Sequence, residues 1–167
     1  ADRTRMTMTR IITADAQELV CEGLRVWLSA RSDLHVEAHA CSGTGLLELA
    51  RSTPADLAML DVSLPGLDGI DTVRELRKRD QNIRILAHSA LTGIEYVDSM
   101  LIEGANGYLV KGGTREALVD AIDVVMGGGR YISPIARANV AQGYAHCDTR
   151  MDGEYLGLSR REREIIV

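Results

Sequence analysis

Two patterns of hydrophobic and polar positions alternate along most of the chain. Short, mostly apolar runs of strand length end at a polar residue, and after each run the apolar residues recur at helical spacing. The strand-like runs lie at residues 11–14, 34–38, 57–60, 83–87 and 108–110. The helical stretches that follow them lie at residues 19–28, 46–51, 73–79, 96–102 and 114–126.

This order predicts the class of fold. Short apolar strands that alternate with helices are typical of a parallel sheet covered by helices on both faces. We therefore predict an α/β fold with a doubly wound, five-stranded parallel sheet. Trp27 lies on the apolar side of the first helix and is expected in the core, and Cys21 and Cys41 are expected to be buried or half-buried.

Composition and charge limit the class of protein. The 167 residues are 46% hydrophobic and 26% charged, which is typical of a soluble globular protein. A net charge of −5 argues against a chain that by itself wraps nucleic acid or coats an anionic membrane. No apolar run approaches the roughly 20 residues that span a bilayer, and no signal peptide is evident. We expect a cytoplasmic protein with no membrane partner, and its three widely spaced cysteines predict neither a disulfide framework nor a zinc site.

Polar residues end four of the five predicted strands. They are Asp15, Asp61, Ser89 and Lys111. In such sheets, ligands bind at the carboxyl ends of the strands. This set suits phosphoryl transfer to a carboxylate, with Asp61 as nucleophile. Lys111 and a divalent cation would supply positive charge at the phosphoryl oxygens, and Ser89 a hydrogen bond.

Two sequence motifs carry a resemblance to a known family. The stretches LDVSLPGLDG (residues 60–69) and GANGYLVK (104–111) resemble receiver domains of bacterial two-component response regulators, in particular the NarL/FixJ, or LuxR-type, family. The resemblance covers residues 9–127 and implies a flavodoxin-like (βα)5 receiver fold. It implies that Asp61 is the phosphoacceptor, that Ser89 and Tyr108 form the switch, and that Lys111 contacts the phosphate.

The resemblance also implies a Mg²⁺ site, which is incomplete here. Asp15, Asp61 and the backbone carbonyl of Ser63 match three of the family's metal-binding positions, but Ala16 replaces a second acid after the first strand. Because Mg²⁺ favours hard oxygen ligands, losing this carboxylate should weaken metal binding and slow phosphorylation. This leaves two readings open: a weakly phosphorylated receiver, or an atypical one that a protein partner or ligand controls independently of phosphorylation.

The two ends of the chain lie outside the receiver stretch. Residues 1–8 have no periodicity and are expected to be disordered or to precede the native start. Residues 128–157 are interpreted as a linker, with a possible short helix at 134–140. Residues 158–167 (LSRREREIIV) resemble the opening of a LuxR-type helix-turn-helix, truncated before the helix that enters the major groove. DNA binding is thus expected only through a full-length C-terminal domain.

The resulting hypothesis is a receiver domain of a DNA-binding response regulator. Asp61 accepts a phosphoryl group from a sensor histidine kinase, and this controls transcription. An enzyme is not expected, because an aspartate-nucleophile phosphatase needs a general acid two residues after its nucleophile, where Ser63 stands here. A homodimer is compatible with the apolar surface of the last helix. His88 is interpreted as packed beneath a helix and not as a phosphate sensor.

Overall fold

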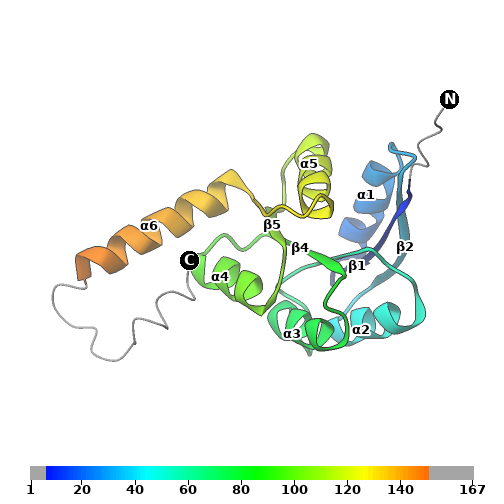
Figure 1. The fold of residues 1–167 in the computed structure, drawn as a ribbon, viewed down its shortest axis with the longest axis horizontal. Coiled ribbons are helices and arrows are strands. Elements are labelled where there is room, and N and C mark those ends of the chain that lie inside the picture. Colours follow the sequence, from blue (N-terminus) through cyan, green and yellow to red (C-terminus); the bar gives the residue numbers. More distant parts are fainter. Residues whose placement is uncertain (1–6, 151–167) are drawn as a thin grey trace.

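The computed structural model describes residues 7–150, with side chains described through Ala145. A parallel sheet in the order β2-β1-β3-β4-β5-β6 lies between helices on its two faces (Figure 1). The strands are β1 (Thr9–Ala14), β2 (Leu34–Ala40), β3 (Leu57–Leu60), β4 (Arg84–Ser89), β5 (Gly107–Val110) and β6 (Tyr131–Ile132). The helices are α1 (Glu18–Leu28), α2 (Gly43–Ser52), α3 (Gly69–Arg79), α4 (Ile94–Glu103), α5 (Arg115–Met126) and α6 (Pro134–Arg150).

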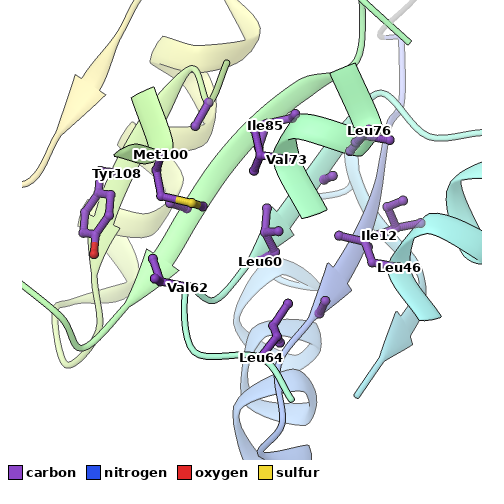
Figure 2. Packing of buried hydrophobic residues seen from close by; sticks show 14 of the residues in the cluster. Ile12, Leu46, Leu60, Val62, Leu64, Val73, Leu76, Ile85, Met100 and Tyr108 are labelled. Carbon is purple, nitrogen blue, oxygen red and sulfur yellow. The ribbon is translucent and has the colours of Figure 1, made fainter. Parts of the chain in front are cut away.

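Each face of the sheet has its own core. Successive strand residues point to opposite faces, so Ile11 packs with α1 and α5, whereas Ile12 packs with α2, α3 and α4. Figure 2 shows the second of these cores, in which Leu60 and Ile85 from the sheet lie near Val73 of α3. Because the strands contribute mostly apolar residues to both cores, they read as short apolar runs in the sequence.

The predicted class of fold is confirmed, but the predicted number of strands is wrong. The sheet has six strands because β6 adds to the edge formed by β5. Ser133 fixes this edge: its backbone N–H donates to the Tyr108 carbonyl (2.9 Å), and its hydroxyl accepts from the Val110 N–H (2.8 Å). A strand of two half-buried residues has no periodicity to detect.

The C-terminal helix is longer than expected. We predicted a linker over residues 128–157 with a possible short helix at 134–140, but α6 continues to Arg150. Its first turns contact α4 and β5, where Ala136 is fully buried, and the helix then extends away from the body of the fold (Figure 1). The proposed helix-turn-helix residues and the first six residues lie outside the described part of the chain.

Two side-chain predictions on the α1–β2 side need correction. Trp27 is 41% exposed and not part of the core. Cys41 is also exposed, whereas Cys21 is buried as expected. Within residues 7–150, no helix is long and apolar enough to cross a membrane.

Candidate functional site

The polar strand ends converge at one edge of the sheet. Because β1, β3, β4 and β5 are neighbours and parallel, Asp15, Asp61, Ser89 and Lys111 come together as predicted. Backbone bonds continue the ladder past the strands: the Asp61 N–H donates to the Ala14 carbonyl (3.0 Å), and the Lys111 N–H donates to the Ser89 carbonyl (2.9 Å). The backbone geometry of the sheet thus fixes the spacing of the site.

Lys111 connects the two acids. Its Nζ donates a hydrogen bond to Asp61 Oδ2 (2.7 Å) and lies 2.5 Å from Asp15 Oδ2 in an ion pair. The side chains of Lys111, Asp61 and Asp15 are only 17%, 10% and 4% exposed. Burial by itself lowers the pKa of Lys111, but the bonds to the two carboxylates outweigh burial and raise this pKa above its usual value. The site therefore holds a charged lysine between two acids.

The Oδ1 atom of each acid accepts a hydrogen bond from a backbone N–H in the loop that follows its strand. Asp15 Oδ1 accepts from the Gln17 N–H (2.8 Å), and Asp61 Oδ1 accepts from the Ser63 N–H (3.2 Å). These local bonds orient each carboxylate before any ligand binds. Ser63 is thus adjacent to Asp61, while the role of its carbonyl as a metal ligand stays a prediction.

Helix α3 begins directly against the phosphoacceptor candidate. Asp68 caps the helix by accepting from the Asp71 N–H, and the Gly69 N–H donates to the Val62 carbonyl (2.9 Å). A Cβ on Gly69 would lie 2.2 Å from the Asp61 carbonyl oxygen and 2.7 Å from the Val62 Cα. Only glycine allows α3 to pack this closely behind Asp61.

The two predicted switch residues meet at the loop between β4 and α4. The Ser89 hydroxyl accepts from the Leu91 N–H (3.2 Å), and the Tyr108 hydroxyl donates to the Leu91 carbonyl (2.5 Å). Tyr108 is fully buried, and this burial raises its pKa to about 12. One loop residue thus links the Ser89 and Tyr108 side chains; their switching role stays a prediction.

Helix α6 contacts the same loop from outside. The Asn139 side chain donates to the Thr92 carbonyl (2.9 Å), and the Tyr144 hydroxyl donates to Asp98 of α4 (3.1 Å). Sequence reasoning missed both contacts, because a single polar residue in a helix with no apolar stripe gives no signal. Loop and helix therefore restrain one another.

We expect Asn139→Ala to loosen the first turns of α6. Loss of the bond to the Thr92 carbonyl removes about 1 kcal/mol, which corresponds to roughly fivefold faster amide hydrogen exchange in the helix. Hydrogen-exchange mass spectrometry on peptides from α6 would measure this. Gln142→Ala, at an exposed position of the same helix, is the control. Equal exchange in the two variants would show that the Asn139 bond does not hold α6.

The fold and site agree with comparisons to known proteins. Residues 11–123 match the response regulator receiver domain family, and because this is more than half of the chain, the chain belongs to that family. Its relatives are response regulators of the NarL/LuxR type. The resemblance inferred from the two motifs is thereby confirmed.

Individual relatives are moderately similar. Response regulator GacA of Pseudomonas aeruginosa is 30% identical over 159 residues, which cover 95% of this chain and 73% of GacA. The transcriptional regulatory protein DegU of Brevibacillus brevis is 30% identical over 135 residues, covering 81% of this chain but only 57% of DegU. The chain therefore spans little more than half to about three quarters of these two relatives.

Two solved structures share both fold and sequence identity. A LuxR-family two-component response regulator from Aurantimonas has a TM-score of 0.79 and 30% identity, with 83% of this chain and 99% of that chain covered. The signal receiver domain of the response regulator NarL from Mycobacterium tuberculosis has a TM-score of 0.70 and 31% identity, with 73% and 98% covered.

The donor set fits a divalent cation with few protein ligands. Receiver domains typically bind Mg²⁺, and Mg²⁺ is commonly held by one or two carboxylates while it keeps several waters. Asp15 and Asp61 supply hard carboxylate oxygens, and the buried Asp15 Oδ2 has no hydrogen-bond partner besides its ion pair with Lys111. Ala16 adds no oxygen, and among the described residues no three His, Cys, Asp or Glu side chains form a metal cluster.

Proposed function

We propose that the chain is the phosphorylated receiver of a transcriptional regulator. Asp61 accepts a phosphoryl group from a phosphohistidine of a sensor histidine kinase, and the modified receiver acts through a C-terminal DNA-binding domain. The observation that supports this most directly is the buried Asp61 carboxylate at the end of β3, 2.7 Å from the Lys111 ammonium.

The proposed step is a displacement at phosphorus. A carboxylate oxygen of Asp61 forms the new P–O bond while the P–N bond to the phosphohistidine breaks, and the imidazole takes the electron pair. Catalysis of such transfers depends mainly on positioning and positive charge at the equatorial oxygens. Lys111 provides one such charge, and it must shift from Asp61 Oδ2 to the incoming group. Mg²⁺ bound at Asp15 and Asp61 would neutralise further charge on the phosphoryl oxygens.

The loop between β4 and α4 would carry the signal onward. The Ser89 hydroxyl accepts from the Leu91 N–H and keeps its own hydrogen for donation. We expect it to turn toward Asp61 and donate to a phosphoryl oxygen there, which would alter its bond with Leu91. Since Tyr108 holds the Leu91 carbonyl and α6 holds the Thr92 carbonyl, a move of this loop changes contacts at both. This route leads from the modified Asp61 toward the C-terminal part of the chain.

Ala16 supports a second candidate function. Without a second acid after β1, the metal site has only two side-chain carboxylates, so a receiver that a protein partner or ligand controls without phosphorylation is the alternative. A turnover enzyme is disfavoured because Ser63 cannot replace the general acid of an aspartate-nucleophile phosphatase.

Intact-mass measurement after incubation with acetyl phosphate tests the proposal. We expect the wild-type chain to gain one phosphoryl group in a Mg²⁺-dependent manner and Asp61→Asn to gain none. We expect Ala16→Asp to lower the Mg²⁺ concentration needed by about tenfold or more, because it adds a carboxylate ligand.

Three outcomes separate the candidates. Modification of the wild type that Asp61→Asn abolishes supports the phosphorylated receiver. An unmodified wild type, with uptake restored by Ala16→Asp, contradicts it and supports the atypical receiver. Modification that persists in Asp61→Asn would place the phosphoacceptor elsewhere and contradict the assignment of Asp61.

A further inference from the structure

A cavity lies behind the phosphoacceptor site, on the α1–α5 face of the sheet. Its volume is about 190 Å³, and it opens between α1 and the loop that joins β5 to α5. Lys111 and His88 line the cavity on the side of the sheet. Most of the wall is formed by apolar side chains, namely Val20, Leu24, Trp27, Leu109 and Leu118. Trp27, which the sequence analysis placed in the core, is thus a partly exposed residue of the cavity wall.

His88 is a polar side chain of this cavity that the proposed phosphoryl transfer does not use. It lies on β4, on the same face of the sheet as Leu86, two residues before it. No hydrogen bond joins its ring to any other residue of the described chain. The half-buried ring lines the cavity, so its nitrogens are available to hydrogen-bond a molecule held there.

The state of His88 constrains the ligand. Burial, and then the charge of Lys111, lower the pKa of His88 to about 4, so the ring is neutral at pH 7. A neutral imidazole offers one N–H donor and one nitrogen acceptor. Lys111, which also lines the cavity, is already paired with Asp15 and Asp61, and these three groups together carry one negative charge, so the cavity wall offers an anion no uncompensated cation. A neutral ligand with a hydroxyl or amine group therefore fits better than a carboxylate or phosphate.

Volume limits the size of the ligand. A closed apolar cavity of about 150 Å³ accommodates benzene, so 190 Å³ admits a single substituted ring. Larger, drug-sized ligands usually occupy about 300 Å³ or more. The apolar walls and the indole of Trp27 favour a flat aromatic ring over a polar sugar or amino acid.

We propose that this cavity binds a small, neutral, single-ring aromatic molecule whose hydroxyl or amine group hydrogen-bonds His88. Occupancy would also reach the phosphoacceptor site, because Lys111 both lines the cavity and contacts Asp15 and Asp61. The binding stands on the cavity alone, whereas its effect on Asp61 rests on the proposed function. A ligand that displaces Lys111 from its present place alters the charge beside the nucleophile.

Phenol and toluene are matched probes for this site. They have nearly the same shape, and only phenol has a hydroxyl. Trp27 is the only tryptophan in the chain, so its fluorescence, excited at wavelengths that phenol does not absorb, reports occupancy directly. We expect saturable binding of phenol to the full chain, about five- to tenfold tighter than that of toluene, as one hydrogen bond would give.

Variants at His88 test the hydrogen bond. His88→Leu should abolish the preference for phenol, and His88→Gln, which keeps a donor and an acceptor, should retain part of it. His35→Leu, at an exposed position on β2, is the matched control and should leave the preference intact. If His88→Leu does not fold, His88→Gln and the wild type still give the phenol-to-toluene ratio.

The outcomes distinguish this proposal from the proposed function. No saturable response to phenol, or an equal affinity for both probes in the wild type, overturns the binding site. A dimer whose dissociation exposes Trp27 would assign this face to a second copy and also overturn it. We further expect saturating phenol to change the acetyl phosphate rate at Asp61 by about fivefold. Binding with an unchanged rate overturns only the coupling, whereas binding without any modification of Asp61 contradicts only the proposed function.

Discussion

Gly69→Ala is expected to lower the free energy of unfolding by about 2–3 kcal/mol, as is usual for an overpacked site. The added methyl group would lie 2.2 Å from the Asp61 carbonyl oxygen and 2.7 Å from the Val62 Cα. Both atoms belong to backbone, so no side chain can rotate away and α3 must shift from the end of β3. Chemical denaturation at neutral pH would measure the loss.

A second helical glycine provides the matched control. Gly23 lies in the middle of α1, and a Cβ there would meet no atom within 4 Å. Gly23→Ala should therefore raise stability by up to about 1 kcal/mol through helix propensity alone. If Gly69→Ala were equally harmless, α3 would not need its close approach to Asp61. We also expect Gly69→Ala to slow phosphorylation, since displaced backbone moves the Asp61 carboxylate from Lys111.

Topology explains why the sequence could place the four strand-end residues together. Once four neighbouring strands are parallel, their carboxyl ends must meet, so residues as distant as Asp15 and Lys111 can be placed together without any coordinates. The ion pairs of Lys111 with both acids agree with this placement. The order of the strands does not predict how the Ser89 and Tyr108 side chains are linked, because both hydrogen-bond the backbone of Leu91.

The incorrect predictions concern β6, the length of α6 and the burial of Trp27, and they have physical causes other than strand order. Strand β6 and helix α6 carry no apolar periodicity. The pair of bonds at Ser133 positions β6, and the contact of Asn139 with the loop before α4 helps to position the first turns of α6. Trp27 was misplaced because helical spacing identifies an apolar face but not its width. The sheet lies under Leu24 and Leu28, and Trp27 falls at the margin of that face.

Ala16 changes the charge of the site as well as its ligand count. Asp15 and Asp61 with Lys111 sum to one negative charge, whereas an acid at position 16 would make it two. A divalent cation is attracted less strongly to a site with one negative charge than to a site with two. Lys111 also neutralises part of the negative potential that the cation would experience between Asp15 and Asp61. We therefore expect Mg²⁺ to bind more weakly here than it would with an acid at position 16.

Stability is expected to fall by about 2 kcal/mol between pH 7 and pH 5 because of His88. Burial, and then the charge of Lys111, lower the pKa of His88 from 6.5 to about 4 in the folded chain, while Asp15 and Asp61 act in the opposite direction. Below pH 6.5 the unfolded chain binds a proton that the folded chain does not. Acid therefore favours unfolding until the pH approaches 4, where the folded chain also takes up the proton.

His88→Leu should remove this part of the pH dependence. Denaturant unfolding at several pH values between 7 and 5 would give the slope for each variant, and the slope of the wild type should be steeper. His35→Leu, which removes a solvent-exposed imidazole from β2, should keep the wild-type slope. Equal slopes in the wild type and His88→Leu would mean that His88 is protonated in the folded chain. Its ring would then be a cation beside Lys111, and the cavity behind Asp61 would favour an anionic ligand over a neutral one.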